Sequence, residues 1–195
     1  MSDEKRPYRK KRRAELEQKT RLRITESAVA LHGSLGPSRT SMSAVAQHAG
    51  VRRSTLYRHF PDEEALFDAC SAHWGAANPA PEIAEWAGIE DPDARLRAAL
   101  EAMYAYYRQT EAIIANLLRD IELPSVGSRM AGFLEYLEAV RGALLRGRAP
   151  RRAVPAAIGH ALAFTTWRSL ARDQQLDDPQ AVELMCRLVA AAYDH

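Results

Sequence analysis

The chain has 195 residues, with 27 Lys and Arg, 25 Asp and Glu, and two Cys. This length suits a small domain joined to a second one and excludes a large multidomain chain, and two cysteines exclude a disulfide-rich scaffold. The charged N-terminus lacks a following apolar segment and no run of about 18 apolar residues occurs, so we expect a cytoplasmic chain with no signal peptide and no membrane contact.

The charges are unevenly distributed along the chain. Residues 1–60 hold 14 basic and 5 acidic residues, whereas residues 61–195 hold 13 basic and 20 acidic ones. An excess of cationic side chains favours a polyanionic partner, because neutralising phosphates releases condensed counterions. The first 60 residues are therefore predicted to contact a nucleic acid, whereas residues 61–195 are not expected to do so.

The segment Arg6–Arg13 reads RPYRKKRR and has no apolar face. Because it cannot bury enough surface to offset its chain entropy, we expect residues 1–13 to be a disordered basic arm in isolation. Such arms lie along DNA phosphates or enter a minor groove. The alternative is a solubilising tail. The candidate DNA contacts in the arm are Arg9, Lys10, Lys11, Arg12 and Arg13.

A helix is predicted from about residue 14 to residue 34. Its apolar stripe, at near-helical spacing, is formed by Leu22, Ile24, Ala28 and Leu31. Glycines and a proline after it, at Gly33 and Gly36-Pro37, are expected to end the helix.

The segment Thr40–Phe60 predicts two short helices joined by a tight turn. Gly50 follows the first helical pattern and supplies the backbone freedom that such a turn needs. Thr40, Ser41 or Ser43 can cap the first helix. The side chains expected to point inward are Val45, Ala46, Ala49, Val51, Leu56 and Phe60.

The outward face of the second helix has three arginines, hydroxyl groups and an imidazole, and no acidic residue. Groups of these kinds bind phosphates and base edges, so this helix-turn-helix is predicted to contact DNA. The alternative is a two-helix corner with a solvated basic face. The residues of this face are Arg52, Arg53, Ser54, Thr55, Tyr57, Arg58 and His59.

A further helix is predicted after Phe60, capped by Asp62 and ending near Asn78. Cys70 and His73 lie three residues apart on this helix, a spacing that can hold a metal ion. No second ligand pair accompanies them. Core packing is therefore the expected role of Cys70, and neither a metal nor a cofactor is predicted.

These motifs resemble the DNA-binding domain of the TetR family of bacterial transcriptional regulators. The likeness covers roughly residues 20–75 and rests on VAQHAGV at Val45–Val51 and STLYRHFPDEEAL at Ser54–Leu66, with Gly36 and Thr40 before them. It implies an all-α homodimer. Residues 14–77 would form a three-helix domain that binds operator DNA, and residues 78–195 a helical domain that binds an inducer and dimerises through its last two helices.

The resemblance also implies site residues. Recognition-helix contacts carry over to Arg53, Ser54, Thr55, Tyr57, Arg58 and His59, and contacts at the start of the preceding helix to Ser41 and Ser43. We expect Arg53 and Arg58 to read bases, because arginine pairs bidentately with guanine. Tyr57 and His59 are expected to position the phosphate backbone.

Three residues depart from the family pattern. Arg52 stands where a serine usually caps the recognition helix, so we expect that cap to be missing or the arginine to reach DNA instead. Glu63 stands where a lysine commonly contacts phosphate, and this contact is expected to be lost, with the basic arm or Arg52-Arg53 as its replacement. His32 stands where an aromatic core residue is common, and we expect it to pack in the core.

The rest of the chain is also predicted to be helical, because no alternating apolar pattern of strand length appears. Asp91-Pro92 opens a helix whose apolar face reaches Tyr107, and a second helix carries Ile113 to Ile121. Three more helices are predicted over about Ser128–Arg146, over about Val154–Arg172, and from Asp178-Pro179 onwards. Small residues in the last two, such as Ala161 and Ala191, permit close helix approach, either across the dimer interface that the resemblance implies or within one subunit.

Large apolar and aromatic side chains lie on the helices that enclose the inducer cavity in the family. Pockets are lined in this way, but so are ordinary cores. Few charged residues share these faces, so a ligand bound there is expected to be hydrophobic or aromatic. The candidate pocket residues are Trp86, Met103, Tyr104, Tyr107, Phe133, Tyr136, Phe164 and Trp167.

The sequence contains no glycine-rich phosphate loop, no G-x-S-x-G motif and no cluster at metal-ligand spacing, so no enzyme is predicted. The predicted function is a sequence-specific DNA-binding regulator, a repressor that a small hydrophobic or aromatic ligand releases from double-stranded operator DNA. The alternative is a DNA-binding regulator that a protein partner controls, or an activator, without a small-molecule inducer.

Overall fold

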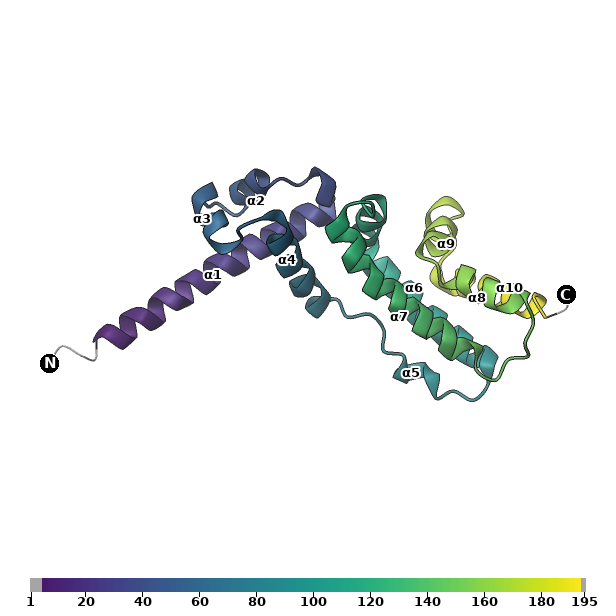
Figure 1. Ribbon diagram of the computed structural model, residues 1–195. Helices are drawn as coiled ribbons and strands as arrows, with labels where there is room; N and C mark the ends of the chain where they lie inside the picture. Colours follow the sequence, from purple (N-terminus) through teal and green to yellow (C-terminus); the bar gives the residue numbers. More distant parts are fainter. Residues whose placement is uncertain (1–4, 194–195) are drawn as a thin grey trace. The chain divides into compact units, whose positions relative to one another are not determined.

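A computed structural model describes residues 5–193, and within this range it contains helices and turns but no strand (Figure 1). The prediction of an all-α chain is therefore confirmed. The described residues divide into two compact units. The N-terminal unit comprises residues 5–78 and 112–129, and the C-terminal unit comprises residues 79–111 and 130–193.

The N-terminal unit contains the helices predicted around the helix-turn-helix. They are α1 (Lys5–Ser34), a 3-10 turn (Pro37–Arg39), α2 (Met42–His48), α3 (Arg53–His59) and α4 (Glu63–Ala77). α1 packs mainly against α4 and α2. The caps expected at two starts are present, because Ser41 accepts a bond from the Ala44 amide at 3.2 Å and Asp62 accepts one from the Ala65 amide at 2.7 Å.

The start of α1 differs from the sequence prediction. The helix begins at Lys5, so residues 5–13 are helical where a disordered arm was expected. Packing of the later turns of α1 against α4 supplies the helix nucleus, and extending an existing helix adds one hydrogen bond per residue at low cost. Met1–Glu4 of the predicted arm lie outside the described residues.

The buried stripe of α1 also differs from the predicted one. Leu22 is 45% exposed, and the most deeply buried residues include Ile24, Thr25, Ala28 and His32. Thr25 can be buried because its hydroxyl donates to the Arg21 carbonyl at 3.0 Å. Because this bond lies within α1, the buried face of the helix can include Thr25. The pattern of apolar residues alone did not predict this face.

Residues 112–129 close the C-terminal end of α1. The Asn116 amide donates to the carbonyls of His32 and Gly33 at 3.1 and 2.7 Å, and the Asp120 carboxylate accepts from the Ser38 amide at 3.0 Å. Asn116 thus supplies a donor to carbonyls at the end of α1, and Asp120 supplies an acceptor to an amide of the 3-10 turn that follows. The sequence predicted a second domain over residues 78–195, whereas in packing residues 112–129 group with the N-terminal unit.

The helices of the remaining chain are α5 (Ala84–Ala87), α6 (Pro92–Arg119), α7 (Pro124–Leu145), α8 (Ala153–Leu162), α9 (Phe164–Arg168), a π-helical turn (Ser169–Asp173) and α10 (Asp178–Ala191). One helix, α6, replaces the two predicted between residues 92 and 121, because no glycine or proline interrupts that stretch.

The helix predicted over about Val154–Arg172 is broken instead at Ala163, whose backbone is extended with ψ 131°. The phenols of Tyr104 and Tyr107 donate to the carbonyls of Ala161 and Leu162 at 2.9 and 2.6 Å. These two carbonyls lie at the end of α8 and need partners when buried. Two tyrosines of α6 therefore stabilise the break, a long-range effect that helical spacing does not reveal.

Candidate nucleic-acid interface

The turn between α2 and α3 is tight and closed by its own backbone. The amides of Gly50 and Val51 donate to the carbonyls of Gln47 and Ala46 at 3.1 and 2.9 Å. Gly50 has φ +63°, the left-handed region that glycine adopts without steric cost. The side chains expected to point inward do so: Val45, Ala46, Ala49, Leu56 and Phe60 are buried and Val51 is half-buried.

The opposite face of this corner is solvent-exposed. Among the predicted contacts, Thr55 and His59 are half-buried, and the exposed ones are Ser41, Ser43, Arg52, Arg53, Ser54, Tyr57 and Arg58. The Arg53 guanidinium lies 5.9 Å from the centre of the Tyr57 ring, one turn further along α3. None of the three arginines forms an ion pair with any residue described here. Their charges are available to a polyanion.

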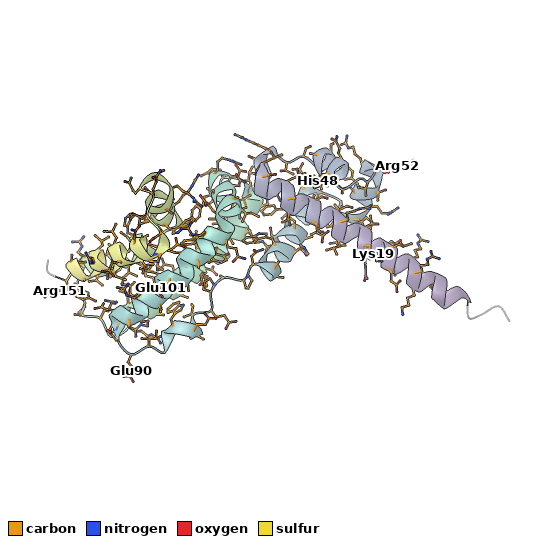
Figure 2. The ribbon with its side chains drawn as sticks, turned by 180° about the vertical axis from the view of Figure 1, so that it is seen from behind. Lys19, His48, Arg52, Glu90, Glu101 and Arg151 are labelled. Atoms are coloured by element: carbon orange, nitrogen blue, oxygen red, sulfur yellow. The ribbon has the colours of Figure 1, made fainter. Side chains whose placement is uncertain are left out.

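Arg52 occupies the N-cap position of α3 and makes no side-chain capping bond, so the predicted loss of this cap is confirmed. Its backbone is extended, with φ −71° and ψ 147°, which is the conformation in which serine caps a helix. Figure 2 labels Arg52 together with His48, a residue of α2 in the same helix-turn-helix. Arg52 therefore lacks the capping hydrogen bond that a serine would make, and it places a cation at the start of α3.

We expect Arg52→Ser to stabilise the protein and weaken its binding to DNA. The serine hydroxyl can accept a bond from an unpaired amide of the first turn, worth about 1 kcal/mol. The loss of one cation near phosphate lowers affinity. Urea unfolding and DNA titration measure the two effects. Arg52→Ala is the matched control, because it removes the charge without adding a cap, and equal stability of the two variants would contradict the capping argument.

His59 ends α3 beneath the exposed face. Burial, followed by the charges of Arg58 and Arg21, lowers its pKa, so its ring is uncharged at neutral pH. Its Nε2 atom is buried and has no hydrogen-bond partner among the described residues. The predicted role of His59 in positioning phosphate stays a prediction.

Arg21 of α1 was missed by the sequence analysis. Its guanidinium donates to the His59 carbonyl at 2.7 Å and lies 4.2 Å from the centre of the Phe60 ring. Both contacts fix the C-terminal end of α3 against α1, and a cation there complements the helix dipole. Helical spacing could have revealed this residue, because Arg21 is 3, 4 and 7 residues before the buried Ile24, Thr25 and Ala28 and therefore lies on the same face of α1.

The acidic flank after α3 has a structural role. Asp62 caps α4, and Glu63 and Glu64 occupy its first turn, where carboxylates complement the helix dipole. All three are exposed. No basic residue stands at this helix start to replace the phosphate-binding lysine of the family pattern.

The basic residues at the start of α1 are an alternative source of positive charge. Lys10, Lys11, Arg12 and Arg13 are exposed on this helix, and Arg13 pairs with Glu17 at 3.2 Å. The side chain of Arg9 lies outside the part of the chain whose side chains are described. Lys19, which Figure 2 labels on α1, is exposed as well.

His32 packs in the core of the N-terminal unit, as expected. Its ring lies 5.6 Å from that of Phe67, and its Nδ1 is 3.3 Å from the Cys70 sulfur. Cys70 is buried and His73 is exposed, so the two do not converge on one point. No group of three His, Cys, Asp or Glu side chains within residues 5–193 could hold a metal ion.

In the C-terminal unit, six of the eight candidate pocket residues are buried and two, Phe133 and Tyr136, are half-buried. Many are packed against one another, with Tyr107 lying 5.4 Å from Phe164 and 5.9 Å from Trp167 between ring centres. The Trp86 indole N–H is buried without an acceptor among the described residues. The tyrosine hydroxyls, by contrast, already have protein partners.

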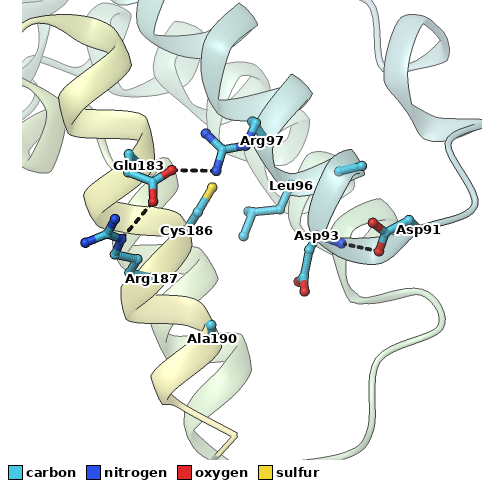
Figure 3. A pocket seen from close by; sticks show the side chains of 9 residues that line it. Asp91, Asp93, Leu96, Arg97, Glu183, Cys186, Arg187 and Ala190 are labelled. Carbon is cyan, nitrogen blue, oxygen red and sulfur yellow. Dashed lines mark hydrogen bonds and ion pairs between the residues drawn. The ribbon is translucent and has the colours of Figure 1, made fainter.

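The same unit has an open groove of about 420 Å³ between the start of α6 and α10 (Figure 3). Its walls are charged, with Arg97 and Arg187 both bonded to Glu183, at 2.6 and 2.7 Å. None of the candidate pocket residues lines it. The groove therefore does not match the apolar ligand that the sequence predicted.

Comparison with known proteins agrees with this geometry. The family described as "Bacterial regulatory proteins, tetR family" matches residues 24–70. An uncharacterised helix-turn-helix transcriptional regulator of Mycobacterium tuberculosis is 31% identical over 129 residues, which are 66% of this chain and 62% of that protein. The aligned part of the chain thus spans less than two thirds of the length of this relative.

Solved structures share the fold. A TetR-like transcriptional regulator from Rhodococcus sp. RHA1 aligns with a TM-score of 0.65 at 20% identity, over 90% of this chain and 96% of its own. AibR, solved in complex with isovaleryl coenzyme A and operator DNA, aligns with a TM-score of 0.60 at 19% identity, over 87% and 97% of the two chains. None of the helices described in the present structure is long and apolar enough to cross a membrane.

Proposed function

The chain belongs through its N-terminal domain to the TetR family of bacterial regulatory proteins, and from this premise we propose that it is a sequence-specific transcriptional repressor of the bacterial cytoplasm. The observation that carries the proposal is the exposed face of α3. Arg53 and Arg58 lie on it without ionic partners among the described residues, and no carboxylate shares the helix. This is the arrangement that phosphate binding and base readout require.

We propose that it acts as a homodimer formed through the last helices, α8 and α10. Leu184 and Leu188 support this, because they are one turn apart on α10 and are 44% and 41% exposed. Two recognition helices related by a two-fold axis enter successive major grooves about 34 Å apart. The operator should therefore contain two inverted half-sites whose centres are about ten base pairs apart.

We further propose that a small hydrophobic or aromatic ligand releases the protein from DNA. The unpaired Trp86 indole N–H supports a ligand with a hydrogen-bond acceptor, because a buried donor without a partner is costly. A small-molecule ligand is known in a protein of this fold, because the structure of AibR contains isovaleryl coenzyme A together with operator DNA. Ligand binding would lower operator affinity only if the ligand prefers the state that binds DNA less tightly.

The alternative is control by a protein partner, and the mutual packing of the candidate pocket residues favours it. The phenols of Tyr104 and Tyr107 are occupied by backbone carbonyls, so a ligand at this point would have to displace protein contacts. Adding the small-molecule and the macromolecular fractions of a cell lysate separately to a purified protein–operator complex separates the two. Release by the small-molecule fraction supports an inducer, and release only by the macromolecular fraction supports a partner.

DNA binding is tested by selecting bound fragments from the source genome and titrating the best of them. We expect Arg53→Ala to reduce discrimination between operator and bulk DNA by about tenfold or more, because one bidentate base contact is worth about 1–3 kcal/mol. Arg23→Ala is the control, since Arg23 is exposed on α1 about 160° around the helix from Arg21, the residue that contacts α3.

Two outcomes would overturn the proposal. Wild-type protein that binds no fragment more tightly than bulk DNA has no operator. Equal loss of discrimination in Arg53→Ala and Arg23→Ala would show that only the net charge matters, and that α3 does not read sequence.

A further inference from the structure

The basic start of α1 has two different sides. Each residue of an α-helix turns by about 100°, so Lys10 lies about 20° from the direction of Arg21, and Lys11 and Arg13 lie about 80° from it on either side. Arg12 and Lys19 lie about 180° and 160° away from that direction. The six residues from Lys10 to Glu15 continue the regular helix of α1, so this phase applies to them.

The side that carries Arg21 is the side next to the recognition helix. Arg21 donates to the His59 carbonyl at 2.7 Å and its guanidinium lies over the Phe60 ring. Glu17, one turn before Arg21, acts on the same residue, because its charge raises the pKa of His59 against the larger lowering effects. Arg21 at this phase thus contacts the C-terminal end of α3, and the charge of Glu17 acts on His59 from the preceding turn.

The charges at this phase suit a polyanion. Lys10 and Lys11 are exposed and form no ion pair with any residue in the described range. Glu17 lies about 40° from the direction of Arg21 and pairs with Arg13 at 3.2 Å. Glu15 lies about 120° from that direction, four residues after Lys11, and forms no ion pair with any residue in the described range. The lysines therefore keep their charge for a partner outside the unit.

We propose that the N-terminal extension of α1 binds double-stranded DNA as a helix, through the side that carries Lys10 and Lys11, and that the opposite side with Arg12 and Lys19 faces solvent. This inference rests on the proposed function. Lys10 lies about 16 Å along α1 from Arg21, which is the length of about five base-pair steps. Figure 1 shows this part of α1 running beyond α3 and α4 of the same unit. The extension therefore lengthens the contact with phosphates beyond the recognition helix.

The test compares two double variants that remove the same charge from the same helix. Lys10→Ala/Lys11→Ala should lower the slope of log K against log salt by about 2, because each phosphate contact contributes about 0.9. Arg12→Ala/Lys19→Ala should leave the slope unchanged. Arg13 stays in place in both, so that Glu17 keeps its partner. Full-length protein, the selected operator and a non-specific duplex of equal length are used.

A slope change of about 1 or more in Arg12→Ala/Lys19→Ala would overturn the proposal, because in a disordered arm Arg12 reaches phosphate whatever its helical phase. No change in either variant would show a solubilising tail. Circular dichroism confirms that alanine has kept both variants helical. Failure of the proposed function is distinguishable, because the wild-type protein would then bind the selected operator no more tightly than the non-specific duplex, whatever the salt slopes of the variants.

Discussion

Replacing Gly36 by alanine should destabilise the N-terminal unit by several kcal/mol, roughly 3 or more. Gly36 has φ +92° and ψ 158°, a conformation that essentially only glycine adopts. A Cβ atom there would lie 1.9 Å from an Arg119 nitrogen and 2.7 Å from an Asp120 oxygen. Both the backbone and the neighbouring side chains therefore oppose the substitution.

The contacts that would be displaced hold the end of α1. Arg119 donates to the Leu35 carbonyl at 2.9 Å, and Asp120 accepts from the Ser38 amide at 3.0 Å. The arginine can move because its side chain is long and exposed, but Asp120 is buried and its carboxylate depends on these bonds. Hydrogen bonds to a charged group are worth about 1.5–3 kcal/mol, so losing one is a large part of the expected effect.

Chemical denaturation of Gly36→Ala and wild type measures this prediction. Gly33→Ala is the matched control three residues earlier in the chain. Gly33 lies in the last turn of α1, and a Cβ atom there meets nothing within 4 Å. Alanine is the better helix former, so the control should be neutral or slightly more stable. Equal destabilisation of the two variants would show that the clash at Gly36 is relieved by movement of residues 112–129.

Predictions based on local chemistry agreed with the structure. The caps at Ser41 and Asp62 and the missing cap at Arg52 each depend on residues no more than three apart, which a sequence displays directly. The buried side chains of α2 and α3 followed in the same way, because periodicity fixes the inner face of a short helix. The exposed basic face of α3 is the complement of that inner face.

Features that depend on contacts distant in sequence were not predicted. Asn116 binds the end of α1 across 84 residues, and Tyr107 stabilises the break at Ala163 across 55. Arg21 reaches His59 across 38 residues. In each case a polar side chain serves the backbone of another helix. Hydrophobic periodicity does not predict such pairs, because they depend on how helices pack and not on which residues are apolar.

In the candidate pocket, too, the spacing of residues does not decide their role. Spacing placed Tyr104 and Tyr107 on an inner helix face, and they are buried there. The same spacing describes a ligand cavity and a packed core equally well. What distinguishes them is whether the polar tips have protein partners, as the two phenols have and the Trp86 indole has not.

Acidification from pH 7 to pH 5 should destabilise the N-terminal unit through His32. Burial lowers the pKa of His32 to about 4, although the charge of Asp120 opposes this effect. An unfolded histidine has a pKa of about 6.5. The unfolded chain therefore binds a proton that the folded chain rejects, and stability present above pH 6.5 is lost as the pH falls toward 4. Between pH 7 and pH 5 the loss is about 2 kcal/mol.

Other groups titrate in or near this window. His59 also has a lowered pKa, so it contributes with the same sign. The pKa of Asp120 is lowered to about 2, so its stabilising effect is lost mainly between pH 4 and pH 2, outside the window. The contribution of His32 is therefore obtained as a difference, by comparing the pH dependence of unfolding in a variant without it.

The variant is His32→Phe, which keeps an aromatic ring beside Phe67 and Cys70 and cannot bind a proton. It should lose about 2 kcal/mol less than wild type between pH 7 and pH 5, whatever its stability at pH 7. His73→Gln is the matched control, because it removes an exposed histidine from α4 of the same unit. If His32→Phe keeps the wild-type pH dependence, protonation of His32 in the folded state is easy and the buried histidine does not limit acid stability.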